Sequence, residues 1–246
     1  MNQSFYTGAV GAQQHLRHLN VVSNNIANIN TYGFKAERAQ FSALMYQNMR
    51  AVEDPVLAGV GGRVQMTSTN FHPGGVADTG RSMDYMIEGD GFFALVDLGT
   101  GEVTYTRDGS FTKSEYLRDS GEVDEAGEPI LEKVYCLSDG NGRFVLSREG
   151  GLIEVDDPQE TLPIGIFDYG NYDGMTKLGE NRFLPIEKNG NLWIGTGKLV
   201  QGALELSNAD LSDELTKVIE AQRAYGLALK VVQTSDEIET VINGLR

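Results

Sequence analysis

The sequence predicts a mainly β protein with additional α-helix: a β-rich central domain flanked by N- and C-terminal helices that form coiled coils. Three observations lead to this fold class. Both ends of the chain repeat apolar residues about every 3.5 positions, which is the spacing of a coiled coil. The 246 residues include 30 glycines, about 12% where roughly 7% is usual. The middle of the chain consists of short apolar runs separated by turn residues.

The N-terminal segment has the pattern of a helix. Steps of four and three residues, taken alternately from Phe5, lead to Leu16, Leu19 and Ile26. The segment 28–33 follows, and its asparagines and glycine tolerate the left-handed conformation that ends many helices. We therefore expect a helix that stops within residues 28–33, with Leu16, Leu19 and Ile26 on the face that meets other helices.

The C-terminal segment repeats this pattern at greater length. The same alternation of steps, interrupted once, places these apolar residues on one face: Leu211, Leu215, Val218, Leu229, Val232, Ile238 and Ile242. Asp210, Asp213 and Glu214 lie where carboxylates favour the start of a helix. We expect a long helix whose apolar face serves assembly.

The middle of the chain is predicted to be β structure. The candidate strands are Tyr85–Ile87, Phe92–Val96, Val103–Thr106, Lys133–Leu137, Arg143–Leu146, Leu152–Val155, Ile164–Phe167 and Arg182–Ile186. Turn pairs such as Asp90-Gly91 and Asp139-Gly140 separate or bound them. The acidic stretch Glu115–Glu132 has no periodicity and is predicted to be an exposed loop.

The charge distribution excludes some classes of partner. The chain carries 20 Lys and Arg residues against 35 Asp and Glu, a formal net charge of −15. Because an acidic surface repels phosphate, we expect no nucleic-acid partner. The single cysteine, Cys136, excludes an internal disulfide, and the first residues lack the basic start and apolar stretch of a secretory signal. No apolar run is long enough to cross a bilayer.

Motifs that carry chemistry are absent or incomplete. Residues 89–94 fit the dinucleotide pattern G-x-G-x-x-A, but the following residues predict a strand where the fingerprint requires a helix. The loop from Asp139 begins like a calcium site, yet its fifth position is Arg143 and its twelfth is Gly150, so a hairpin is the better interpretation. His15 and His18 have no third ligand pattern beside them. We expect no catalytic residue, no cofactor, no metal and no small-molecule substrate.

Four segments resemble one known family. The N-terminal block contains Asn24, Asn25, Asn28, Thr31, Gly33 and Phe34, in the order of the N-terminal signature of flagellar rod and hook proteins. Residues 202–208 and 221–225 are similar to the C-terminal counterparts, and residues 84–93 and 105–111 to the β-domain segments. The segments occur in the same order as in that family. Residues 71–84 resemble the proximal-rod subtype more than the distal-rod type, which is the second choice.

The resemblance implies a structural subunit of the bacterial flagellar basal-body rod, without enzymatic activity. It implies self-assembly through the terminal helices after export by the flagellar type III apparatus. The implied partners are other copies of the chain, neighbouring rod and hook-family proteins and the export apparatus. The implied location is the extracytoplasmic basal body, periplasmic where two membranes are present.

The implied domains are an N-terminal helix of the inner tube domain over residues 1–35, an extended connector over 36–80, a β-rich central domain over 81–202 and a C-terminal inner-tube helix over 203–246. Asn24, Asn25 and Asn28 are expected to satisfy backbone groups where the first helix ends.

Two other classes of function stay open from the residues alone. A secreted β-sandwich binding module would use the acidic surface for a basic ligand. A hydrolase would need a carboxylate pair with widely separated pKa values in a deep cleft. Within the resembling family, a distal-rod or hook-type subunit is the alternative.

Overall fold

The computed structural model describes residues 3–44, 46–48, 57–59, 61–123, 129–156 and 162–245. The chain forms two compact units. The helical unit spans Met1–Ile29, Ala36–Asn70 and Ala209–Arg246, and the β unit spans Asn30–Lys35 and Phe71–Asn208. The chain therefore passes between the units four times.

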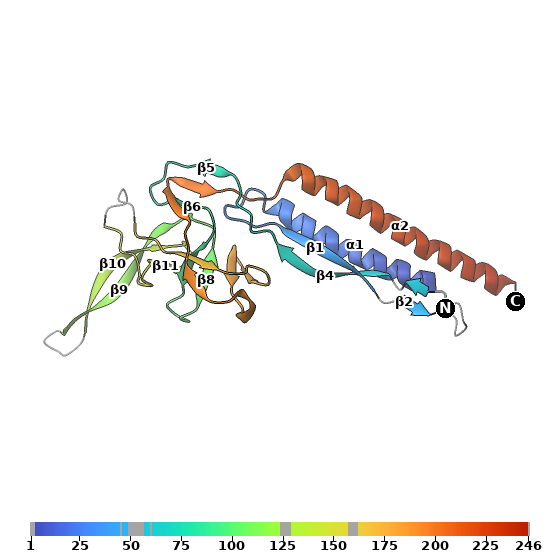
Figure 1. The fold of residues 1–246 in the computed structure, drawn as a ribbon, viewed down its shortest axis with the longest axis horizontal. Helices are drawn as coiled ribbons and strands as arrows, with labels where there is room; N and C mark the ends of the chain where they lie inside the picture. The colour runs from blue at the N-terminus through green and yellow to red at the C-terminus, as the bar shows by residue number, and fades with distance from the viewer. Residues whose placement is uncertain are drawn as a thin grey trace. The chain divides into compact units, whose positions relative to one another are not determined.

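Two long helices lie side by side in the helical unit (Figure 1). Helix α1 is Gln3–Ala27 and helix α2 is Leu211–Gly244. The carboxylate of Asp210 caps α2, since it accepts hydrogen bonds from the backbone N–H groups of Ser212 at 2.8 Å and Asp213 at 3.1 Å. Both predicted helices are confirmed. Neither has a run long and apolar enough to cross a membrane within the residues that the structure covers.

A β-hairpin packs along α1 in the same unit. Strand β1, Glu37–Ala43, pairs antiparallel with β4, Gly62–Thr69. Gln14 on α1 holds the hairpin, because its Oε1 accepts a hydrogen bond from the N–H of Val64 at 2.9 Å. The short strands β2, Tyr46–Asn48, and β3, Leu57–Gly59, also pair. The sequence predicts an extended connector over residues 36–80 and does not reveal this strand pairing. The reason is that the hairpin is mostly polar and shows no clear apolar alternation.

The β unit contains one nine-stranded sheet and two strand pairs. The strands of the sheet run in the order β13-β14-β8-β7-β11-β10-β9, and β12 pairs with both β7 and β15. Their bounds are β7 Phe92–Val96, β8 Val103–Thr106, β9 Thr112–Val123, β10 Pro129–Ser138, β11 Phe144–Val145, β12 Ile166–Tyr169, β13 Thr176–Gly179, β14 Arg182–Leu184 and β15 Leu192–Ile194. The pairs are β6 Tyr85–Glu88 with β16 Lys198–Gln201, and β5 Val76–Asp78 with β17 Ala203–Glu205.

Strand β7 lies at the centre of the β unit's core. Its alternating side chains point to opposite faces, so Phe93 and Leu95 join one apolar cluster with Tyr85. Phe92 and Ala94 join a second cluster on the other face. A strand covered on both faces reads as a continuous apolar run, which is why its bounds were predictable from sequence.

The strand predictions are largely confirmed. Phe92–Val96 and Val103–Thr106 are β7 and β8 with the predicted bounds, and the Gly89–Gly91 turn connects β6 to β7. The predicted strand Leu152–Val155 is wrong, because Leu152 and Glu154 make only isolated bridges. The predicted hairpin after Asp139 is confirmed: it connects β10 to β11, and the N–H of Asp139 donates to the carbonyl oxygen of Arg143 at 3.0 Å.

The acidic stretch Glu115–Glu132, predicted to be a loop, is instead part of the β9–β10 hairpin (Figure 1). Opposite charges face each other across its two strands. Lys133 Nζ lies 2.8 Å from Glu115 Oε1, and Arg118 Nη2 lies 3.1 Å from Glu132 Oε2. Charged cross-strand pairs can stabilise a hairpin without any apolar alternation, so the sequence pattern revealed only the part of β10 over Lys133–Leu137. Residues 124–128 lie outside the described part of this hairpin.

Candidate assembly site

Small residues make the contact between the two terminal helices. The buried residues of α2 are Glu214, Ala221 and Ser235, which lie at multiples of seven positions, and Gly8 and Ala12 are buried on α1. A Cβ atom on Gly8 would lie 3.0 Å from Val232 Cγ2 and 3.2 Å from the carbonyl oxygen of Ala228. The helix backbones therefore approach closely, and this contact has no room for large side chains.

Val232 packs against Gly8 in this contact, and the other nine residues predicted to mediate assembly lie outside it or at its edge. Leu16, Leu211, Leu215, Leu229, Ile238 and Ile242 are exposed, and Leu19, Ile26, Val218 and Val232 are partly buried. Leu215 keeps 48% and Ile242 56% of its surface accessible. The structure thus does not gather the ten into one cluster within the chain. It leaves most of them available to other molecules.

Sequence reasoning singled out only Ile238 from a second set of exposed apolar residues on α2. Leu227, Val231, Ile238 and Val241 recur at steps of four, seven and three, and Leu227 is 63% exposed. At about 100° per residue this set lies on the flank opposite to Leu215 and Leu229, with the contact to α1 between the two flanks. A search for a second register of the heptad pattern could have found it. Apolar flanks on both sides of a buried contact are typical of a helix with more than one neighbour.

Asn25 connects three elements of the helical unit. Its Oδ1 accepts a hydrogen bond from the N–H of Glu37 at 2.9 Å, and its Nδ2 donates to the carbonyl oxygen of Glu37 at 2.8 Å and to Oε2 of Glu214 at 3.1 Å. Asn25 therefore joins α1 to β1 and to α2. At the end of α1, Asn28 Nδ2 donates to the carbonyl oxygen of Asn24 at 2.9 Å.

The motif residues Thr31, Gly33 and Phe34 belong to the β unit. Gly33 has a φ of +65°, and a Cβ atom there would lie 2.4 Å from the backbone nitrogen of Asp108. Only glycine fits this conformation and this distance. Phe34 is buried, and Lys177 Nζ lies 5.0 Å from the centroid of its ring. The motif therefore folds as a tightly packed insert of the β unit.

Three charged side chains are buried next to this insert. Lys35, Glu205 and Arg107 keep 1%, 3% and 3% of their surface accessible. Lys35 Nζ lies 2.6 Å from Glu205 Oε1, and Arg107 Nη1 lies 3.3 Å from Glu205 Oε2. Burial lowers the pKa of Lys35, and Glu205 partly opposes that shift. Sequence reasoning gave none of the three a role, because a single charge in a β-rich sequence carries no sign of its partner.

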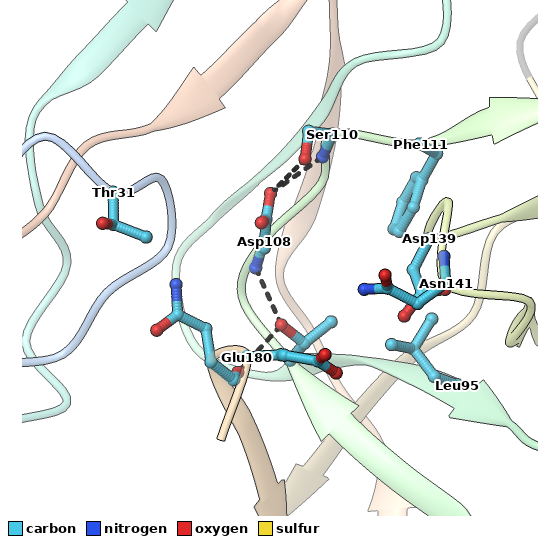
Figure 2. A pocket seen from close by; sticks show the side chains of 10 residues that line it. Thr31, Leu95, Asp108, Ser110, Phe111, Asp139, Asn141 and Glu180 are labelled. Carbon is cyan, nitrogen blue, oxygen red and sulfur yellow. Dashed lines mark hydrogen bonds between the residues drawn. The ribbon is translucent and has the colours of Figure 1, made fainter. Parts of the chain in front are cut away.

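The β unit holds a cavity of about 140 Å³ with a largely polar lining (Figure 2). It is lined by Thr31, Leu95, Thr106, Asp108, Ser110, Phe111, Asp139, Asn141, Glu180 and Asn181. The carboxylates already have partners. Asp108 Oδ1 accepts from Ser110 N–H at 3.0 Å, and Arg143 donates to Asp139 Oδ2 at 2.6 Å and to Glu180 Oε2 at 2.5 Å.

Within the described residues, no three His, Cys, Asp or Glu side chains are placed to share a metal ion. Cys136 is buried, and burial raises the pKa of its thiol, so it packs as a small apolar residue. Partial burial lowers the pKa of His18, and His15 and Lys217 lower it further, whereas Glu214 and Glu220 raise it. These groups form structural contacts within the chain.

Comparison with known families assigns the two ends and much of the middle of the chain. Residues 5–35 match the family described as "Flagella basal body rod protein". Residues 86–157 match the "Flagellar hook protein FlgE/F/G D1 domain", and residues 200–245 match the "Flagellar basal body rod FlgEFG protein C-terminal". Except for residues 84 and 85, these three segments contain the four segments on which the resemblance was based.

Similar proteins match over nearly the whole chain. The flagellar basal-body rod protein FlgG of Buchnera aphidicola subsp. Schizaphis graminum is 34% identical over 260 residues, covering 97% of each chain. FlgG of Borreliella burgdorferi is 31% identical over 267 residues, covering 100% of this chain and 99% of its relative. The rod protein FlgF of Caulobacter vibrioides is 31% identical over 249 residues, covering 97% and 95%. The chain therefore belongs to the FlgG family of flagellar basal-body rod proteins, and it is a structural component of the basal body rather than an enzyme.

Proposed function

We propose that the chain assembles into the rod by burying the exposed apolar residues of α1 and α2 against other copies of itself and against neighbouring rod and hook-family proteins. The observation that carries this proposal is the pair of apolar flanks on α2, one through Leu215 and Leu229 and the other through Leu227 and Val231. Monomeric proteins rarely expose large apolar patches on their surface.

The free energy gained by burying these flanks supports stable assembly rather than a weak encounter. Full burial of a leucine side chain contributes about 1.5–3 kcal/mol, so covering the exposed half of Leu215 contributes roughly 1 kcal/mol. Each flank holds several such residues, and every copy in a rod would contribute two flanks. The sum over a subunit is then on the order of several kcal/mol.

A charge on one flank tests the proposal. We expect Leu215→Asp to prevent rod formation, because assembly would bury an unpaired carboxylate. Leu215→Met is the matched control, since it changes the side chain at the same position and keeps it apolar. Position 215 is exposed, so both variants should fold. Motility and purified basal bodies are the readouts, and a motile Leu215→Asp strain would contradict the proposal.

Export through the flagellar type III apparatus is part of the same proposal. A chain with one cysteine forms no internal disulfide, and this suits a protein that is threaded in an unfolded state. The chain is then expected to fold and assemble outside the cytoplasm, without nucleic acid or a small-molecule substrate as partner. Secretion of the chain by a strain that lacks the export apparatus would contradict this step.

The position of the chain along the rod stays a prediction. Residues 71–84 favour the proximal subtype, with a distal-rod or hook-type position as the alternative. Deletion of the gene followed by electron microscopy of basal bodies distinguishes them. A loss at the base of the rod indicates a proximal position, and a truncated upper rod indicates a distal one.

A further inference from the structure

Three segments of the β unit lead to the helical unit. They are residues 30–35, residues 71–75 and residues 205–208, each of which adjoins a point where the chain passes between the units. We call them the exit segments. All three are held by one side chain or its immediate neighbours.

That side chain is Glu205. Its Oε1 accepts hydrogen bonds from Lys35 Nζ at 2.6 Å and from the N–H of Gly74 at 2.8 Å. Its Oε2 accepts from Arg107 Nη1 at 3.3 Å, and its backbone oxygen accepts from the N–H of Gly33 at 2.7 Å. Glu205 thus bonds to both of the other exit segments and, through Arg107, to the body of the β unit.

Further hydrogen bonds connect the exit segments directly. Lys35 Nζ donates to the carbonyl oxygen of His72 at 3.0 Å, and Asn208 Nδ2 donates to the same oxygen at 2.9 Å. The N–H of Asn208 donates to the carbonyl oxygen of Phe34 at 3.3 Å. Arg107 Nη2 anchors the group by donating to the carbonyl oxygen of Gly89 at 2.8 Å.

Burial of charge is an inefficient way to stabilise a fold. Removing two ions from water costs several kcal/mol, and apolar residues of similar volume often stabilise a protein as well or better. What a buried carboxylate provides instead is a fixed direction for each donor around it. Here one negative charge faces two positive ones, so the geometry depends on Glu205 more than on either cation.

We propose that Glu205 is a positioning residue for assembly: its carboxylate fixes the three exit segments, so that the chain leaves the β unit in one arrangement. This inference rests on the proposed function, since it supposes that the helices carry assembly. Glu205 would contribute no contact to another copy, because it is buried within its own β unit.

Hydrogen exchange of the full-length, unassembled chain tests the positioning itself. We expect Glu205→Gln, which keeps the shape and removes the charge, to raise exchange of the Gly33, Gly74 and Asn208 amides about tenfold or more. Exchange of the Phe93 and Leu95 amides in β7 should stay unchanged, and basal bodies should lack the rod. Glu102→Gln, the same change at an exposed position, should match the wild type in both measurements.

A second variant separates positioning from stability. Lys35→Met leaves the Arg107–Glu205 pair balanced and keeps the acceptor of the Gly74 N–H, although it removes the bond to His72. We therefore expect a smaller rise in exchange at Gly74 than Glu205→Gln causes. The proposal is overturned if Glu205→Gln exchanges like the wild type, if the β7 amides are also exposed, or if rods assemble normally despite faster exchange at the exit segments. Because exchange is measured before assembly, a failure of the proposed function, seen with Leu215→Asp, remains distinguishable.

Discussion

Gly33 offers the sharpest test of how the motif packs in the β unit. Replacement by alanine has two costs there. The φ of +65° is a left-handed conformation that costs an L-residue about 1–2 kcal/mol. The new Cβ would also lie 2.4 Å from the Asp108 nitrogen and 2.6 Å from the Arg107 carbonyl carbon, and such overpacking typically costs about 1–3 kcal/mol. We expect Gly33→Ala to lower the free energy of unfolding by about 2–5 kcal/mol.

Gly80→Ala is the matched control. Gly80 has a φ of +64°, but no atom lies within 4 Å of the Cβ position, so only the backbone cost applies. Both variants can be followed in urea by the fluorescence of Trp193, the chain's single tryptophan, which lies in β15 of the same unit. Equal destabilisation by the two substitutions would refute the argument that the backbone at 107–108 excludes a side chain from residue 33.

Three further predictions concern the helical unit. Gly226→Ala should stabilise it by about 1 kcal/mol, since nothing lies near the new Cβ atom. Gly8→Ala should not gain this stability, because its new Cβ atom would press against Val232 of α2. Thermal unfolding followed by circular dichroism at 222 nm compares the two variants. Partial burial lowers the pKa of His18, so the unfolded chain takes up the proton first as the pH falls. The unit should therefore lose stability below about pH 6.5, and His18→Gln should flatten this dependence in urea titrations at several pH values. Leu19→Asp should abolish motility while the Trp193 signal of the β unit stays native, and a motile strain would contradict that.

The terminal helices could be predicted from the sequence because their repeats are long and regular. The small residues Gly8, Ala9, Gly11 and Ala12 indicate a patch of α1 that another backbone can approach closely, and Gly8 and Ala12 are buried in the structure. The apolar repeat did not show that Ala221 is the buried small residue on α2. Small residues contribute close backbone approach rather than apolar area, and a search for large apolar residues does not weigh that contribution.

The β unit was predictable where strands are buried and not where they are charged. Strand β7 is covered on both faces and has a continuous apolar sequence. The β9–β10 hairpin depends on pairs such as Glu115 with Lys133, which are 18 positions apart and become neighbours only when the two strands pair. The buried group of Lys35, Glu205 and Arg107 escaped prediction for the same reason, since its members come from distant parts of the chain.

The chemical reactivity of a cysteine at position 215 tests the central claim most directly. Cys136 is only 1% exposed, so a Leu215→Cys variant carries one accessible thiol. The account predicts that this thiol reacts readily with a maleimide in the purified, unassembled chain and is protected in basal bodies isolated from a motile strain carrying the variant. Equal reaction rates in the two states would show that the flank of α2 stays open to solvent in the rod, and would contradict the claim that it mediates assembly.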